Sequence, residues 1–138
     1  MTDDALVAKK LAFIETCVRE LRELARPERI DRDLREERFV AHTLQLAIQA
    51  ALDVASHIVS DERLGEPASN RQLFELLVDN GWVPSSLARP LAQMAGFRNV
   101  LVHGYQDVDK AVVRDVVETR LNEFTDFVAA VRSRLMGT

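Results

Sequence analysis

Apolar residues recur at intervals of three and four along most of this 138-residue chain, with charged residues between them. This spacing predicts amphipathic α-helices, because positions three and four apart share one face of a helix. The predicted helices run over about residues 4–25, from Glu36 or Glu37 to about Asp61, over 71–79, from Ser85 or Ser86 towards His103, and from Asp107 or Asp109 to about Leu135. No segment alternates apolar and polar residues as a half-buried strand does, so we expect an all-α protein.

The second predicted helix is the most apolar, and its apolar residues cover more than one of its faces. Such a helix belongs at the centre of a bundle or against a second subunit. Four long helices and one or two short ones predict an up-and-down four-helix bundle, formed as a single domain over residues 1–138. The charges of the first helix, Lys9 and Lys10 among them, are expected to form a solvated face.

Composition and charge narrow the possible functions. The formal net charge is −4, which is unlike a protein that binds nucleic acid over its whole surface, because such binding depends on neutralising phosphates. The single cysteine, Cys17, excludes an internal disulfide and is expected in the core. No Cys and His pattern suggests a metal site, and we expect no cofactor. Without an apolar signal sequence or a membrane-spanning segment, the protein is expected to be cytoplasmic.

Chemically distinctive side chains gather at the end of the fourth predicted helix. Arg98 carries a guanidinium that stays protonated and can hold a phosphate through two N–H groups. His103 is the natural group for proton transfer, because the reference pKa of histidine lies near neutrality. Tyr105 can position a phosphate or a base, and Asn99 can support the others. Positions 98 and 103 lie about 140° apart around an ideal helix, so they converge only if the helix unwinds near His103 or if two subunits share the site.

The spacing Arg98-x4-His103-x-Tyr105 resembles the R-x4-H-x-Y motif of the HEPN superfamily, and specifically of the HepT-like toxins. Four segments are similar to that family as well: residues 96–99 and 107–109 around the motif, and residues 44–49 and 53–58 in the second predicted helix. The resemblance implies a HEPN-like bundle that forms a homodimer with the motif at the dimer cleft. It also implies a metal-independent endoribonuclease that is the toxin of a type II/VII-like toxin–antitoxin pair. The implied antitoxin is a minimal nucleotidyltransferase of the MNT type, which in some such pairs adenylylates the motif tyrosine, here Tyr105.

On this interpretation RNA is cut by its own 2′-hydroxyl, with Arg98 stabilising the charge at phosphorus and His103 transferring a proton. Tyr105 positions the RNA or receives a nucleotide, Asn99 supports them, and the product carries a 2′,3′-cyclic phosphate. The alternative is a non-catalytic helical partner of a nucleotidyltransferase, in which Arg98 and Tyr105 bind nucleotide or substrate.

A polar stripe follows the second predicted helix at intervals of four: Gln45, Gln49, Asp53 and His57. Gln49 and Asp53 either line the cleft or face solvent. Asp53 is expected to pair with His57 as a structural contact, since residues four apart are neighbours on a helix. Outside this stripe, His42 is expected at the surface and Trp82 in a packed corner.

Overall fold

The computed structural model describes residues 3–103 and 109–137, with only the backbone described for His103. Its α-helices are α1 (Asp4–Leu24), α2 (Leu34–Asp61), α3 (Asn70–Asp79), α4 (Ala88–His103), α5 (Lys110–Thr119) and α6 (Asn122–Leu135). Two short 3₁₀ helices, η1 (Pro27–Arg29) and η2 (Ser85–Leu87), precede α2 and α4. No strand occurs in these residues, which agrees with the all-α prediction.

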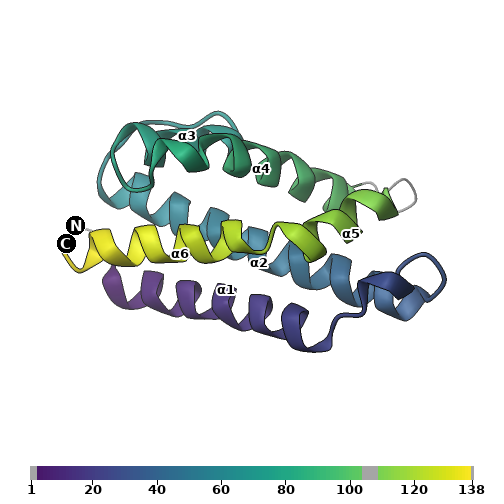
Figure 1. Ribbon diagram of the computed structural model, residues 1–138. Coiled ribbons are helices and arrows are strands. Elements are labelled where there is room, and N and C mark those ends of the chain that lie inside the picture. The colour runs from purple at the N-terminus through teal and green to yellow at the C-terminus, as the bar shows by residue number, and fades with distance from the viewer. Residues whose placement is uncertain (1–2, 104–108, 138) are drawn as a thin grey trace.

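The long helices run alternately up and down, as Figure 1 shows for α1, α2, α4 and the α5–α6 pair. This arrangement confirms the predicted four-helix bundle. The start of α1 and the end of α6 lie at one end of the bundle, whereas α4 ends at the other, beside the start of α5 (Figure 1). The short helix α3 packs against α2 and α4.

Helix α2 is the centre of the bundle, because it packs against α1, α3, α4 and α5. Twelve of its residues are buried, which explains why its sequence is apolar over more than one face. The aromatic core lies between α3 and α6, where the rings of Phe74 and Phe127 meet edge to face with their centroids 5.9 Å apart. Burial of these apolar surfaces is the main favourable term in folding.

Aspartates cap three of the helices, α1, α2 and α5, by accepting hydrogen bonds from otherwise unpaired backbone N–H groups, and Asp3 is the cap of α1. Asp109 accepts from the N–H of Ala111 at 2.9 Å, so it is the cap of α5 that the sequence suggested. Asp33 accepts from the N–H of Arg35 at 2.9 Å. Because of this cap, α2 begins at Leu34, two or three residues before the predicted start at Glu36 or Glu37.

The prediction of a single last helix that runs to about Leu135 is wrong. The structure divides this segment into α5 and α6 at Arg120 and Leu121. The Thr119 hydroxyl donates to the carbonyl of Asp115 at 2.8 Å, a contact that slightly destabilises helices and often bends them. The break lets α5 pack against α2 and η1 while α6 packs against α1. One straight helix would not follow both surfaces.

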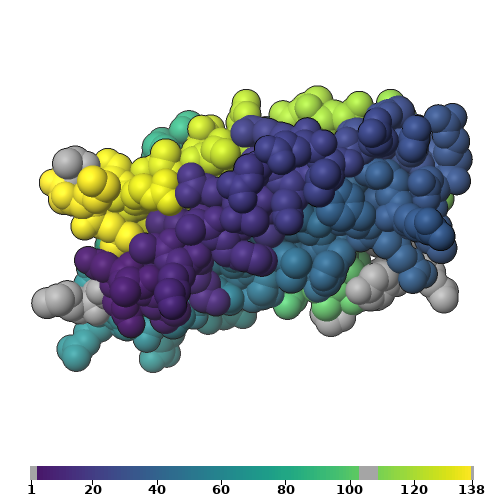
Figure 2. Space-filling model, turned by 90° about the horizontal axis from the view of Figure 1, so that it is seen from below, coloured from purple at the N-terminus to yellow at the C-terminus, as the bar shows by residue number. Residues whose placement is uncertain are grey.

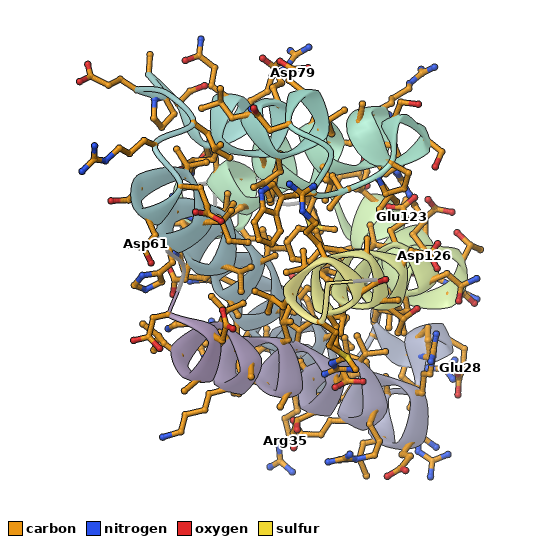
Figure 3. The ribbon with its side chains drawn as sticks, turned by 90° about the vertical axis from the view of Figure 1, so that its left-hand side faces the viewer. Glu28, Arg35, Asp61, Asp79, Glu123 and Asp126 are labelled. Atoms are coloured by element: carbon orange, nitrogen blue, oxygen red, sulfur yellow. The ribbon has the colours of Figure 1, made fainter. Side chains whose placement is uncertain are left out.

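Charged side chains lie on the outside of the bundle, as the view along its length shows for Glu28, Arg35 and Asp79 (Figure 3). No helix in the described part of the chain is both long enough and apolar enough to cross a membrane.

Candidate active site at the junction of α2 and α4

Arg98 lies on α4 and is hydrogen-bonded to the central helix α2. Its Nε and Nη2 both donate to Oε1 of Gln49, at 3.2 Å and 3.1 Å. Its Nη1 lies 3.4 Å from Oδ1 of Asn99, the next residue, which makes a weaker contact. The guanidinium is half-buried, so these contacts restrict its position more than they would at a fully exposed site.

The contacts of Arg98 continue along α2 and across to α1. Nε2 of Gln49 donates to Oδ1 of Asp53 at 2.9 Å, and Nζ of Lys10 lies 3.2 Å from Oδ2 of the same carboxylate. Lys10, Asp53, Gln49 and Arg98 thus form one connected series of polar side chains on three helices, which we call the polar relay. Within this relay, Gln49 holds the Arg98 guanidinium at its Nε and Nη2 atoms, and Asp53 and Lys10 hold Gln49 in turn. All three residues lie far from Arg98 in the sequence.

A hollow of about 380 Å³ lies between α1 and α2 along the polar relay. Its lining residues are Leu6, Lys9, Lys10, Phe13, Leu46, Gln49, Ala50 and Asp53. Figure 2 views the side of the molecule on which α1 lies against α2. Gln49 and Asp53 therefore both contact this hollow and bond to other side chains, whereas the sequence left open whether they line a cleft or face solvent.

The other two motif residues are described in part or not at all. The backbone of α4 is helical through His103, so the helix does not unwind between Arg98 and His103. Those two positions are therefore about 140° apart around the helix axis. The His103 side chain and the whole of Tyr105 lie outside the described residues, so their catalytic and positioning roles stay predictions.

The expected Asp53–His57 pair does not form. The two Asp53 oxygens are taken by Gln49 on the same helix and by Lys10 on α1. The two contacts place an amide donor on one oxygen of the carboxylate and an ammonium on the other, so both oxygens already have a partner. Among the described residues, no three His, Cys, Asp or Glu side chains are grouped where they could hold a metal ion.

Lys10 is the residue that sequence reasoning missed. It was assigned to the solvated face of the first helix, yet it contacts a carboxylate 43 positions away. The spacing of Gln49 and Asp53 by four residues was the only visible sign of the relay. Nothing in the sequence indicates which face of α1 lies over that stripe.

Three other side chains lie where the sequence placed them. Cys17 is 1% exposed, and burial, followed by the charge of Glu20, raises the pKa of its thiol to about 11. Trp82 is buried, with the Arg134 guanidinium 4.8 Å from its ring centroid. His42 is exposed on α2.

The sequence matches the family model of the HepT-like ribonucleases over residues 14–131. The mRNA nuclease HepT of Shewanella oneidensis is 30% identical over 129 residues, which make up 93% of this chain and 97% of that protein. The tRNA nuclease HepT of Aphanizomenon flos-aquae is 33% identical over 93 residues, which make up 67% of this chain and 63% of that protein.

Solved structures share the fold over nearly the whole chain. The tri-AMPylated HEPN toxin of Shewanella oneidensis in complex with MNT antitoxin has a TM-score of 0.86 and 30% identity, covering 96% of this chain and 99% of that one. A toxin–antitoxin crystal structure with AMP-PNP has a TM-score of 0.87 and 28% identity, covering 94% of this chain and 98% of that one. These similarities confirm the HEPN-like bundle that the motif implied.

Proposed function

Since the family model covers residues 14–131, the chain belongs to the HepT-like ribonuclease family, and we propose that it is a metal-independent endoribonuclease acting as a toxin. One observation of the structure carries the proposal. The Arg98 guanidinium is held by Gln49 at the junction of α2 and α4, five residues before His103 on the same helix. A fixed cation and a group that titrates near neutrality are what metal-free RNA cleavage needs.

The reaction transfers phosphorus between two oxygens of the RNA itself. The 2′-oxygen forms a bond to phosphorus, the bond from phosphorus to the 5′-oxygen breaks, and a proton passes from the 2′-hydroxyl to the leaving oxygen. His103 transfers this proton, and Arg98 stabilises the negative charge that builds up on the phosphate oxygens. Tyr105 positions the RNA, with Asn99 supporting the site. The products carry a 2′,3′-cyclic phosphate and a 5′-hydroxyl.

The proposal includes the assembly in which the protein works. Two copies form a homodimer, which brings two motifs to one cleft and concentrates the positive charge of two Arg98 side chains there. This local charge offsets the formal net charge of −4 where RNA binds. The antitoxin is an MNT-type nucleotidyltransferase, consistent with the AMPylated HEPN toxin of Shewanella oneidensis in complex with MNT antitoxin. Adenylylation of Tyr105 would fill the cleft with bulk and negative charge. The protein acts in the cytoplasm, on RNA.

The test is an RNA cleavage assay in EDTA with the purified, unmodified protein, the state of Tyr105 being checked by mass spectrometry. We expect cleavage with cyclic phosphate ends, lost in His103→Ala and kept in His42→Ala, a histidine variant at an exposed position on α2. Circular dichroism is used to check that each variant is folded. If unmodified protein leaves several RNAs uncut, or if His103→Ala cuts as well as wild type, the ribonuclease proposal fails. Nucleotide binding by Arg98 and Tyr105 would then be tested, as the role of a non-catalytic partner.

A further inference from the structure

We propose that Lys10, Asp53 and Gln49 are positioning residues that fix the orientation of the Arg98 guanidinium by fixing the direction of the Gln49 amide. The inference rests on the proposed ribonuclease function for its consequence, and on the contacts of the polar relay for its geometry. None of these three residues is assigned a chemical step.

The direction of the Gln49 amide follows from the chemistry of its two neighbours. A guanidinium only donates hydrogen bonds, and an ionised carboxylate only accepts them. Between Arg98 and Asp53, the amide therefore has one satisfactory arrangement, with its oxygen towards Arg98 and its NH₂ towards Asp53. That arrangement is present, with contacts of 3.1 Å and 3.2 Å on one side and 2.9 Å on the other.

Lys10 completes the series from a third helix. Its ammonium, which also only donates, occupies the Asp53 oxygen that Gln49 does not use. The side chains of Lys10 and Asp53 are 32% and 36% exposed, and ion pairs with this exposure contribute little to stability. The larger effect of the Lys10–Asp53 ion pair is to hold the carboxylate in place, so that the Gln49 NH₂ faces a fixed acceptor.

The two hydrogen bonds from Arg98 to Oε1 of Gln49 determine which edge of the guanidinium remains for a ligand. Nε and Nη2 form one edge, and both donate to Gln49. The edge formed by Nη1 and the second N–H of Nη2, where Nη1 makes only the weak 3.4 Å contact with Asn99, is then the one that can bind a phosphate through two parallel hydrogen bonds. If the amide turned over, its NH₂ would face the guanidinium. Two sets of donors would meet, and Arg98 would have to move.

The decisive variant exchanges the two charges, as Lys10→Asp combined with Asp53→Lys. The exchange keeps an ion pair between α1 and α2 but places a donor beside Gln49, which favours the reversed amide. If the ion pair only stabilises the fold, the exchanged variant should be as stable and as active as the wild type. If the pair positions Arg98, the exchanged variant should be as stable as the wild type but less active. The matched control is the exchange Arg71→Glu with Glu75→Arg, an exposed pair on α3 whose Nε and Oε1 atoms are 3.0 Å apart.

We expect the exchanged variant to unfold at the wild-type temperature while kcat for RNA cleavage falls on the order of tenfold to a hundredfold, with KM changed far less. Gln49→Met, which keeps the length but removes the acceptor, should show the same pattern. Lys10→Arg, which keeps a donor against Asp53, should lose much less, and the Arg71–Glu75 exchange should lose nothing. Full activity in the charge-exchanged variant or in Gln49→Met would overturn the inference.

A second readout does not depend on cleavage. In ¹H–¹⁵N NMR spectra, the Arg98 Nε–H signal is identified by its absence in Arg98→Lys. We expect slow exchange with water in the wild type and faster exchange in both Gln49→Met and the charge-exchanged variant. An unchanged signal in these variants would overturn the positioning role, whatever the activity. If the wild type does not cleave RNA but the signal responds as expected, the proposed function fails and the positioning of Arg98 stands.

Discussion

At the scale of single residues, Cys17 shows how burial sets chemical reactivity. The side chain faces the core from α1, and loss of hydration disfavours the thiolate, with the charge of Glu20 adding to the effect. The pKa of the thiol is therefore raised from 9.0 to about 11. At any pH below both values, the thiolate fraction is about a hundredfold smaller than in the unfolded chain.

This pKa predicts slow alkylation of the native protein. At pH 8, iodoacetamide should modify Cys17 at least about a hundredfold more slowly in the folded chain than in urea, as measured by mass spectrometry. The free energy of unfolding should depend on pH for the same reason, because the thiol pKa differs between the folded and the unfolded chain. The protonated thiol favours folding, so its contribution is complete below about pH 9 and is lost as the pH rises towards 11. Cys17→Ala, which has no thiol, provides the baseline. Native and unfolded chains that react equally fast would contradict the prediction.

Single residues also show what a sequence can and cannot reveal about the candidate site. Arg98, His103 and Tyr105 were recognisable because their spacing is a local property of the chain. The contact of Lys10 with Asp53 was not, because it depends on how α1 is rotated and shifted along α2. The i, i+4 stripe on α2 suggested His57 as a local partner for Asp53. The folded chain instead places the Lys10 ammonium of α1 against this carboxylate.

At the scale of elements, helix α4 contains an unexplained weak point at Gly96. A glycine in a helix interior costs about 0.5–1 kcal/mol relative to alanine, chiefly through backbone entropy. A close neighbour would justify that cost, but a Cβ built at Gly96 meets no described atom within 4 Å. Among the residues that the structure describes, therefore, no packing contact requires glycine two residues before Arg98.

We accordingly expect Gly96→Ala to raise the free energy of unfolding by about 0.5–1 kcal/mol, measured by urea denaturation at fixed protein concentration. The contrasting control is Gly65→Ala, which should destabilise the protein. Gly65 has a φ of +143°, and its added Cβ would lie 3.3 Å from a Leu76 methyl group. No gain in Gly96→Ala, together with a weaker homodimer in sedimentation, would show instead that a second copy lies against this position.

The division between α5 and α6 marks the limit of element prediction from sequence. Helices α1 to α4 were predicted because apolar periodicity, capping residues and prolines are local signals. The break at Arg120 and Leu121 has neither glycine nor proline, and the apolar stripe continues across it. Its causes are tertiary as well as local: Leu121 is buried, and Arg120 donates to Gln93 on α4. Such contacts become visible only once α4 and α5 are placed together.

At the scale of the whole molecule, the helical backbone through His103 has a consequence for how a site is built. Positions 98 and 103 are about 140° apart around an ideal helix, so we expect the two residues to reach one phosphate only with a second copy of the chain. A two-fold axis offers a solution, in which Arg98 of one subunit meets His103 of the other. The sequence predicted the bundle and the motif, but it left open whether the helix unwinds near His103 or two subunits share the site.

Mixed dimers test this sharing directly. An Arg98→Gln chain and a His103→Ala chain, co-expressed with different tags and purified as a mixed dimer, should cleave RNA at about half the wild-type rate, because one of the two shared sites keeps both residues. Each variant alone should be inactive. The reciprocal dimer, which pairs wild type with a chain carrying both substitutions, places one substitution in each shared site and should be inactive too. If each chain instead builds its own site, the pattern reverses: the first dimer is inactive and the reciprocal one keeps about half the activity.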